Sequence, residues 1–363
     1  MSGCNWTDPV ISRRRCLAAT GASLILSKTL TKACKSAEET PYKALLDKLS
    51  EPPAGPASAD NLMTNEDSIA SVLDRLGELP PRMAYLGVGP DQNFSMIAAA
   101  QPSLALILDY RTKNRNLHLL HKALVESSVD RAAYLSLMWA RSPGIDPATR
   151  ADAARLVAAF AAAPMKPQLL AEAQEMVRRS LEAKGFRSEE DLAEIRKIQA
   201  RLAGPGPEAR FLALKMYPAI GRLIAMKTRS CRPGHWLADD ALYPEVRRLH
   251  QADAILPVVA DWAGTQAMPN IAVYLNEKRI QVGCVYVSDV EFFLFRAGSF
   301  DRYVANLARL PIADEAVIVR TSTREIGHPE RIPGHSSTTV VRSLREFLEA
   351  ARAGKIRRWE DLF

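Results

Sequence analysis

Short uninterrupted apolar runs alternate with amphipathic stretches from residue 83 onward. Runs of this length are typical of parallel strands buried on both faces. Strands joined by a crossover helix predict a parallel βαβ unit. The first strands are expected at 83–88 and 104–108, and the first helices at 91–100 and 113–126.

The same alternation returns after residue 240. Further strands are expected at 254–259, 281–287 and 315–320, and further helices at 265–278, 301–309 and 343–353. Strands and helices that alternate in this way favour an α/β fold with a doubly wound, mostly parallel, Rossmann-like sheet.

Between these two stretches the pattern is helical only. Residues 146–240 are rich in Ala, Glu, Arg and Leu, and Leu192, Ile195, Ile198 and Leu202 recur at helical spacing. We expect about four helices here, inserted into one domain and covering an edge or the mouth of its sheet.

These patterns divide the chain into consecutive parts. They are a targeting segment at 1–37, a linker at 38–60, an α/β domain at 61–345 with its helical insertion at 146–240, and a C-terminal helix and tail at 346–363. The linker ends in Glu-Pro-Pro-Ala-Gly-Pro-Ala-Ser, and such residues build no core of their own. Order is therefore expected from Asn61 onward.

The N-terminus resembles a twin-arginine export signal. Residues 12–17 read Ser-Arg-Arg-Arg-Cys-Leu, an apolar run follows at 16–26, and Thr31-Lys32-Ala33 offers a cleavage pattern. The apolar run is shorter than the roughly 20 residues that a spanning helix needs. We expect export by the twin-arginine translocase to the periplasm or another extracytoplasmic compartment. The alternative is a basic N-terminus on a cytoplasmic protein.

The cysteines bear on a lipid anchor, a disulfide and a metal site. Cys34 follows Ala33, which leaves a lipid anchor open, although Lys32 fits a lipobox poorly. Cys284 lies in an apolar run, where a lone buried thiol is favoured over a disulfide with Cys231. The cysteine spacing matches no metal motif, and no metal site is expected.

The charge of the chain is concentrated at its N-terminus. The formal net charge is +7, but residues 1–37 hold six basic residues against Asp8, and the remainder holds 42 basic against 40 acidic residues. A nucleic-acid-binding surface is usually strongly basic. The near balance after residue 37 therefore argues against nucleic acid and leaves a small molecule as the expected partner.

The turn after the first expected strand carries the candidate ligand site. Gly87 and Gly89 follow that strand, and glycine lets a backbone approach a ligand closely. Asp109 ends the next strand, 22 residues after Gly87, where an acid can accept hydrogen bonds from a ribose diol. The alternative is a tight turn beside a surface aspartate.

The same turn narrows the choice of nucleotide. A dinucleotide fingerprint needs a third glycine at position 92, which is Gln92, and the chain has no Walker A sequence. S-adenosylmethionine has no phosphate and needs neither feature. Asp261, at the end of a later strand, could meet the adenine edge or could cap a helix.

Four strings of residues resemble a largely uncharacterised bacterial family related to a leptospiral protein. They are 64–68, 85–93, 258–264 and 286–291, within a resemblance that covers 61–145 and 241–320. Members of that family look like class I methyltransferases in fold. The resemblance implies a cleft shaped for S-adenosylmethionine, with Asp91 and Asn93 among its cofactor-binding residues. Tyr85 stands where such enzymes usually have an acid.

Methyl transfer demands alignment of the methyl group with its acceptor and, in some cases, a base. Asp289 and Glu291 follow an expected strand and are the catalytic candidates, although acids at a helix N-terminus are also favoured by the helix dipole. Asn65 and Glu66 could cover the pocket or cap a helix. His118 and His121 have a spacing that can bind metal, but a packed pair is the simpler interpretation.

These features predict an S-adenosylmethionine-binding, methyltransferase-like protein with an unknown acceptor. An exported protein would carry only one equivalent of this cytoplasmic cofactor, which cannot sustain turnover. The alternative is therefore an exported, non-catalytic binding or structural protein on the same scaffold. A third hypothesis is an enzyme of another class, such as a hydrolase, that uses Asp289 or Glu291.

Overall fold

A computed structural model describes residues 40–54, 61–324 and 327–363 of the chain. The expected export signal, its cleavage pattern and Cys34 lie outside the described residues. Residues 39–363 form a single compact unit.

A mixed sheet forms the centre of this unit. Its strands in the described residues are β1 (Ala84–Val88), β2 (Leu104–Asp109), β3 (Ile255–Val259), β4 (Val282–Ser288), β5 (Ile312–Ser322) and β6 (Thr338–Ser343). Their order is β3-β2-β1-β4-β5-β6. The first five strands in that order are parallel, and β6 pairs antiparallel with β5. The expected α/β class with a mostly parallel sheet is therefore confirmed.

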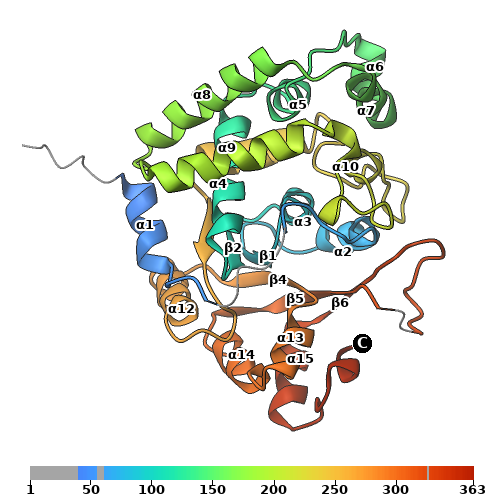
Figure 1. The fold of residues 1–363 in the computed structure, drawn as a ribbon. Helices are drawn as coiled ribbons and strands as arrows, with labels where there is room; N and C mark the ends of the chain where they lie inside the picture. Colours follow the sequence, from blue (N-terminus) through green and yellow to red (C-terminus); the bar gives the residue numbers. More distant parts are fainter. Residues whose placement is uncertain (1–39, 55–60, 325–326) are drawn as a thin grey trace, which may run out of the picture. The chain divides into compact units, whose positions relative to one another are not determined.

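Helices cover both faces of the sheet, as Figure 1 shows. One face carries α3 (Gln92–Ala100), α4 (Thr112–Glu126) and α11 (Tyr243–Gln251). The other carries α12 (Ala267–Lys278), α13 (Val290–Arg296), α14 (Phe300–Leu307) and α15 (Leu344–Arg352). Every residue of β1 and β2 is buried as a result, which explains why these strands lack polar alternation.

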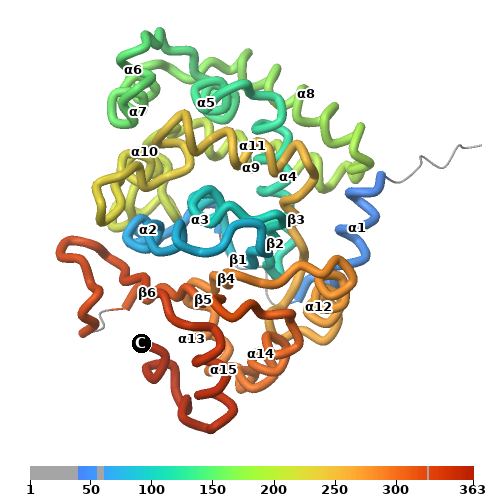
Figure 2. Tube along the Cα trace, turned by 180° about the vertical axis from the view of Figure 1, so that it is seen from behind, coloured from blue at the N-terminus to red at the C-terminus, as the bar shows by residue number. Residues whose placement is uncertain are grey.

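The helical insertion forms a further layer outside α4. After α5 (Arg131–Trp139), the described residues form α6 (Pro147–Ala151), α7 (Ala153–Ala162), α8 (Pro167–Ala183), α9 (Glu189–Ala203) and α10 (Ile220–Ile224). Two short 3₁₀ turns, Gly206–Glu208 and Phe211–Ala213, lie between α9 and α10. Helices α8 and α9 pack on α4, and Figure 2 shows the same layer from behind. Five α-helices thus stand where about four were expected.

The expected linker contains a packed helix, α1 (Pro41–Leu49). Tyr42 donates from its hydroxyl to the carbonyl of Ile255 at 2.9 Å. The Ser50 hydroxyl oxygen accepts from the N–H of Val259 at 3.1 Å, and the backbone N–H of Glu51 donates to the Val259 carbonyl at 2.9 Å. Strand β3 is an edge of the sheet, and an open edge pairs readily with other chains. The segment after Thr40 covers that edge, so 40–54 is not the coreless linker that was expected.

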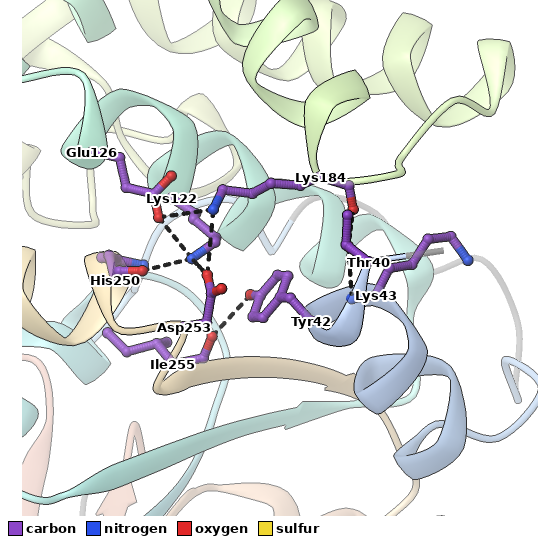
Figure 3. Close-up of polar contacts among 9 residues, drawn as sticks. All are labelled: Thr40, Tyr42, Lys43, Lys122, Glu126, Lys184, His250, Asp253 and Ile255. Carbon is purple, nitrogen blue, oxygen red and sulfur yellow. Dashed lines mark hydrogen bonds and ion pairs between the residues drawn. The ribbon is translucent and has the colours of Figure 1, made fainter. Parts of the chain in front are cut away.

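Helix α1 also covers a buried lysine, shown in Figure 3. The Lys122 ammonium donates to the His250 carbonyl and to Asp253, both at 2.6 Å, and pairs with Glu126 at 2.8 Å. It lies 4.4 Å from the ring centre of Tyr42. Two carboxylates and an aromatic face compensate the loss of water around this cation.

Two cysteines fall in the described residues, and both are free thiols. Cys284 is buried in β4, as expected, and Cys231 is exposed. Every helix in the described part of the chain is too short or too polar to cross a bilayer.

Candidate functional site

The turn after β1 is filled by the protein's own side chains. A Cβ built on Gly87 would lie 1.9 Å from Asn93 Oδ1 and 2.7 Å from the Tyr85 ring and hydroxyl. The Asn93 amide donates to the carbonyls of Val88, Gly89 and Pro90 at 2.9, 3.2 and 2.7 Å. Asn93 Oδ1 accepts from the Tyr85 hydroxyl at 2.8 Å. The absence of a side chain at Gly87 thus serves the close approach of Asn93 and Tyr85.

His118 also contacts the turn after β1. Gly89 has a φ of +81°, the left-handed conformation that favours glycine. His118 Nε2 lies 2.8 Å from the Gly89 carbonyl oxygen, and burial lowers the pKa of His118 to about 4. The neutral imidazole therefore donates to the turn. His121 lies 2.8 Å from the Tyr134 hydroxyl through Nδ1, so the two histidines form a packed pair.

Asp109 lies at the end of β2, as expected, but its carboxylate already has a partner. The Arg111 backbone N–H donates to Oδ1 at 3.0 Å, and the guanidinium donates to both carboxylate oxygens at 2.7 Å. A two-pronged arginine pair of this kind is strong and directional. A ribose could reach Asp109 only if Arg111 moved aside.

Asp261 follows β3 and lies in a local turn. Its Oδ1 accepts from the Ala263 N–H at 2.9 Å, and its own N–H donates to Glu51 at 2.7 Å. Glu51 also accepts from the N–H groups of Gln266 and Ala267 at 3.2 and 3.0 Å, at the start of α12. The capping role therefore belongs to Glu51, and Asp261 forms the turn that precedes the helix.

A buried acid, Glu66, lies over the carboxyl end of β4. It accepts from the Tyr286 hydroxyl at 2.7 Å and from the Ser288 hydroxyl. Gln92, at the start of α3, donates to the Tyr286 hydroxyl at 3.1 Å. Burial raises the pKa of Glu66 to about 7, and its hydroxyl partners offset part of that rise. The interpretation that Glu66 covers the pocket stays a prediction.

A small cavity joins Glu66 to a second acid. Glu66, Asp91, Gln92 and His235 are among the residues that line a space of about 20 Å³, enough for about one water molecule. Burial raises the pKa of Asp91 to about 6 and lowers that of His235 to about 3. Two acids with raised pKa values line a cavity beside the switch point between β1 and β4, which makes this cavity a candidate ligand site.

Part of this cluster could have been found in the sequence. Tyr286 and Ser288 are two residues apart in a strand and therefore share one face. Their partner Glu66 is 220 positions before Tyr286, and no local pattern links them. His235 comes from the irregular segment after α10, which carries no periodic pattern at all.

The two catalytic candidates have different surroundings. Asp289 lies at the N-terminal end of α13, and burial raises its pKa although the charges of Arg324 and Arg111 lower it in part. Glu291 is buried in an ion pair with Arg320 and accepts from the Tyr303 hydroxyl at 2.9 Å. Glu291 was expected at the mouth of a cleft. Its carboxylate is instead buried and already accepts from Arg320 and Tyr303.

The two histidines of α4, His118 and His121, have a spacing that can bind metal, for which a packed pair was the simpler interpretation. Among the residues that the structure describes, no three His, Cys, Asp or Glu side chains are grouped as a metal would need. His118 and His121 instead pack against Phe94, with ring centres 5.5 and 5.3 Å from the phenyl ring.

The fold and the site define a Rossmann-like α/β protein with a closed polar cluster at the β1–β4 switch point. Residues 62–360 match a protein family described as Domain of unknown function (DUF7790), and the chain belongs to that family. No curated protein matches the chain.

Proposed function

We propose that this protein is a non-catalytic binding or structural protein on a methyltransferase-like scaffold. The order β3-β2-β1-β4-β5, the glycine turn after β1 and the acid that ends β2 support the scaffold assignment. The proposal includes export through the twin-arginine translocase, with residues 1–37 as the signal.

One observation carries the functional part of the proposal. Asn93 and Tyr85 occupy the space above Gly87 in which an adenosyl group would have to lie. An adenosyl ligand would have to displace the Asn93 amide from three carbonyls. The free energy needed to break several buried hydrogen bonds at once exceeds the binding free energy of a weak ligand.

A second candidate is an S-adenosylmethionine-binding protein. The left-handed Gly89 and the position of Asp109 favour it. In that case Asn93 and Arg111 must both move before the ligand binds. Asp289 would then be the residue best placed to orient an acceptor, and Glu291 would hold Arg320.

The two candidate functions are distinguished by testing which ligands the purified full chain carries and which ligands it binds. We expect no S-adenosylmethionine or S-adenosylhomocysteine in the supernatant after denaturation, by mass spectrometry. We also expect no calorimetric binding of either compound at concentrations up to about 1 mM. Saturable binding of S-adenosylmethionine that Asp109→Ala abolishes would establish the second candidate instead.

A further inference from the structure

A wide groove lies on the helical insertion, and none of its lining residues belongs to the turn at 87–93. It runs between the segment that begins at Asn61 and the segment 201–215. Its volume is about 750 Å³, within the range of small-molecule sites. The cavity beside Glu66 is far smaller, at about 20 Å³.

The floor of the groove is apolar and its rim is basic. Arg201, Arg210 and Lys215 lie at the rim, against a single acid, Glu208. Glu208 pairs with Arg210 at 3.0 Å, so Lys215 leaves the rim with a net positive charge. The buried apolar residues of the lining form the floor, namely Leu62, Met63, Leu202 and Ala209, and the exposed Pro205 and Ala213 complete the apolar lining.

The outer side of the same segment carries exposed apolar side chains. Leu212, Leu214 and Met216 are 36, 45 and 73% exposed. They alternate with Ala213 and Lys215, which line the groove. Single exposed apolar residues are ordinary, but a cluster beside a pocket marks a contact surface for an apolar partner.

The backbone of this segment is held in an unfavourable conformation. Leu212 and Ala213 are consecutive non-glycine residues with φ of +51° and +54°. Arg210 fixes the loop by donating to the Tyr217 carbonyl at 2.8 Å, and Phe211 packs edge-on against Tyr217. Left-handed residues outside glycine concentrate at ligand and binding sites.

We propose that this groove binds a single-chain anionic amphiphile. Its acyl chain lies on Leu62, Met63 and Leu202, and its negative head group meets Lys215 and Arg210. Lys215 has no ion-pair partner among the described residues, so its charge is available to a ligand. The apolar side chains at 212, 214 and 216 form the entrance. The proposal goes beyond the proposed function, since no groove residue belongs to the turn at 87–93.

The test is a calorimetric titration of the full chain with decanoate, below its micelle concentration. We expect saturable binding with one ligand per chain. Decyltrimethylammonium has the same chain with the opposite charge and should bind at least about fivefold more weakly. Butyrate has the same head group without the chain and should show no saturable binding, because the apolar burial is lost.

A charge reversal in the groove tests the head-group site. Lys215→Glu should weaken decanoate binding about fivefold to tenfold. Lys355→Glu makes the same change at an exposed position after α15, outside the lining of the groove, and should leave the affinity unchanged. Thermal unfolding of both variants checks that they fold.

Any one of three results in these titrations would overturn the proposal. They are no saturable binding of decanoate, equal binding of the anionic and cationic ligands, and an equal effect of the two lysine variants. Binding to phosphatidylglycerol vesicles without binding to decanoate would likewise overturn it, and would assign the apolar loop to a membrane surface.

Discussion

Gly87 has no room for a side chain, because Asn93 Oδ1 lies 1.9 Å from the position of its Cβ. We expect Gly87→Ala to lower the free energy of unfolding by about 2–4 kcal/mol, since a buried clash must be relieved. Gly144→Ala is the control, because nothing lies within 4 Å of its Cβ position, and should change it by less than about 0.5 kcal/mol. Urea unfolding measures both. A Gly87→Ala protein of normal stability would show that this space is not filled.

Glu66 is a buried carboxyl group whose protonation depends on folding. Its pKa is about 7 in the folded protein against an ordinary value of 4.5. The folded state therefore holds a proton between pH 4.5 and 7 that the unfolded state has lost, and this contribution to stability decreases as the pH rises through that window.

Glu66→Gln removes this dependence. Relative to wild type, the free energy of unfolding of Glu66→Gln should rise between pH 4.5 and 7 by up to about 3 kcal/mol and then level off. Denaturant unfolding at several pH values measures the difference. A difference that is the same at pH 5 and pH 8 would contradict a raised pKa for Glu66.

Glu291 and Asp289 should respond differently to loss of their charge. Glu291→Gln leaves the buried Arg320 guanidinium without its counter-ion, and such a loss costs about 3–5 kcal/mol. Asp289→Asn removes a partly exposed charge and should cost less than about 1 kcal/mol. Thermal unfolding compares the two, and equal losses would refute a purely structural role for Glu291.

At the scale of elements, helix α1 contacts both Lys122 and strand β3 through Tyr42. Tyr42→Ala removes the ring from Lys122 and the hydrogen bond to Ile255, and we expect a loss of about 3–5 kcal/mol. Lys48→Ala, on the exposed side of the same helix, should be nearly neutral. Hydrogen exchange of the Val259 amide gives a local readout, because that amide donates to Ser50. If the Val259 amide were equally protected from exchange in Tyr42→Ala, the packing of Tyr42 would not be needed for α1 to cover the edge of β3.

The sequence predicts those elements whose pattern is local. Strands β1 and β2 were expected within one residue of their bounds, because uninterrupted apolar runs are unambiguous when both faces are covered. Helix α1 was missed because the prolines after Glu51 dominate its surroundings. Strand β6 begins with Thr338 and Thr339 and lacks such a run.

The polar surroundings of β6 explain why it was missed. The Thr339 hydroxyl lies 2.6 Å from that of Ser68 and 2.9 Å from that of Thr321. Hydroxyl pairs of this kind satisfy buried polar groups, but they join residues up to 271 positions apart. Asn93 fills the turn after β1, and Arg111 occupies the carboxylate of Asp109. Both contacts depend on the direction of a side chain, which the spacing of residues in the sequence does not predict.

At the scale of the whole molecule, the proposed export signal at residues 1–37 gives a prediction about the compartment. A reporter fused after residue 37 should be exported, and blocking the twin-arginine translocase should retain it in the cytoplasm. Arg13→Lys together with Arg14→Lys should reduce export while keeping the charge. Cell fractionation measures the result, and a reporter that remains cytoplasmic in untreated cells would refute the signal.

The cover of β3 by residues 42–51 also limits how far the chain can be trimmed. A maturation protease that cut before Thr40 would leave this cover in place. Cutting after Pro52 would release it and bare the outer backbone of β3, which could then join the same strand of a second molecule. An over-trimmed chain would therefore be recovered as dimers or larger assemblies.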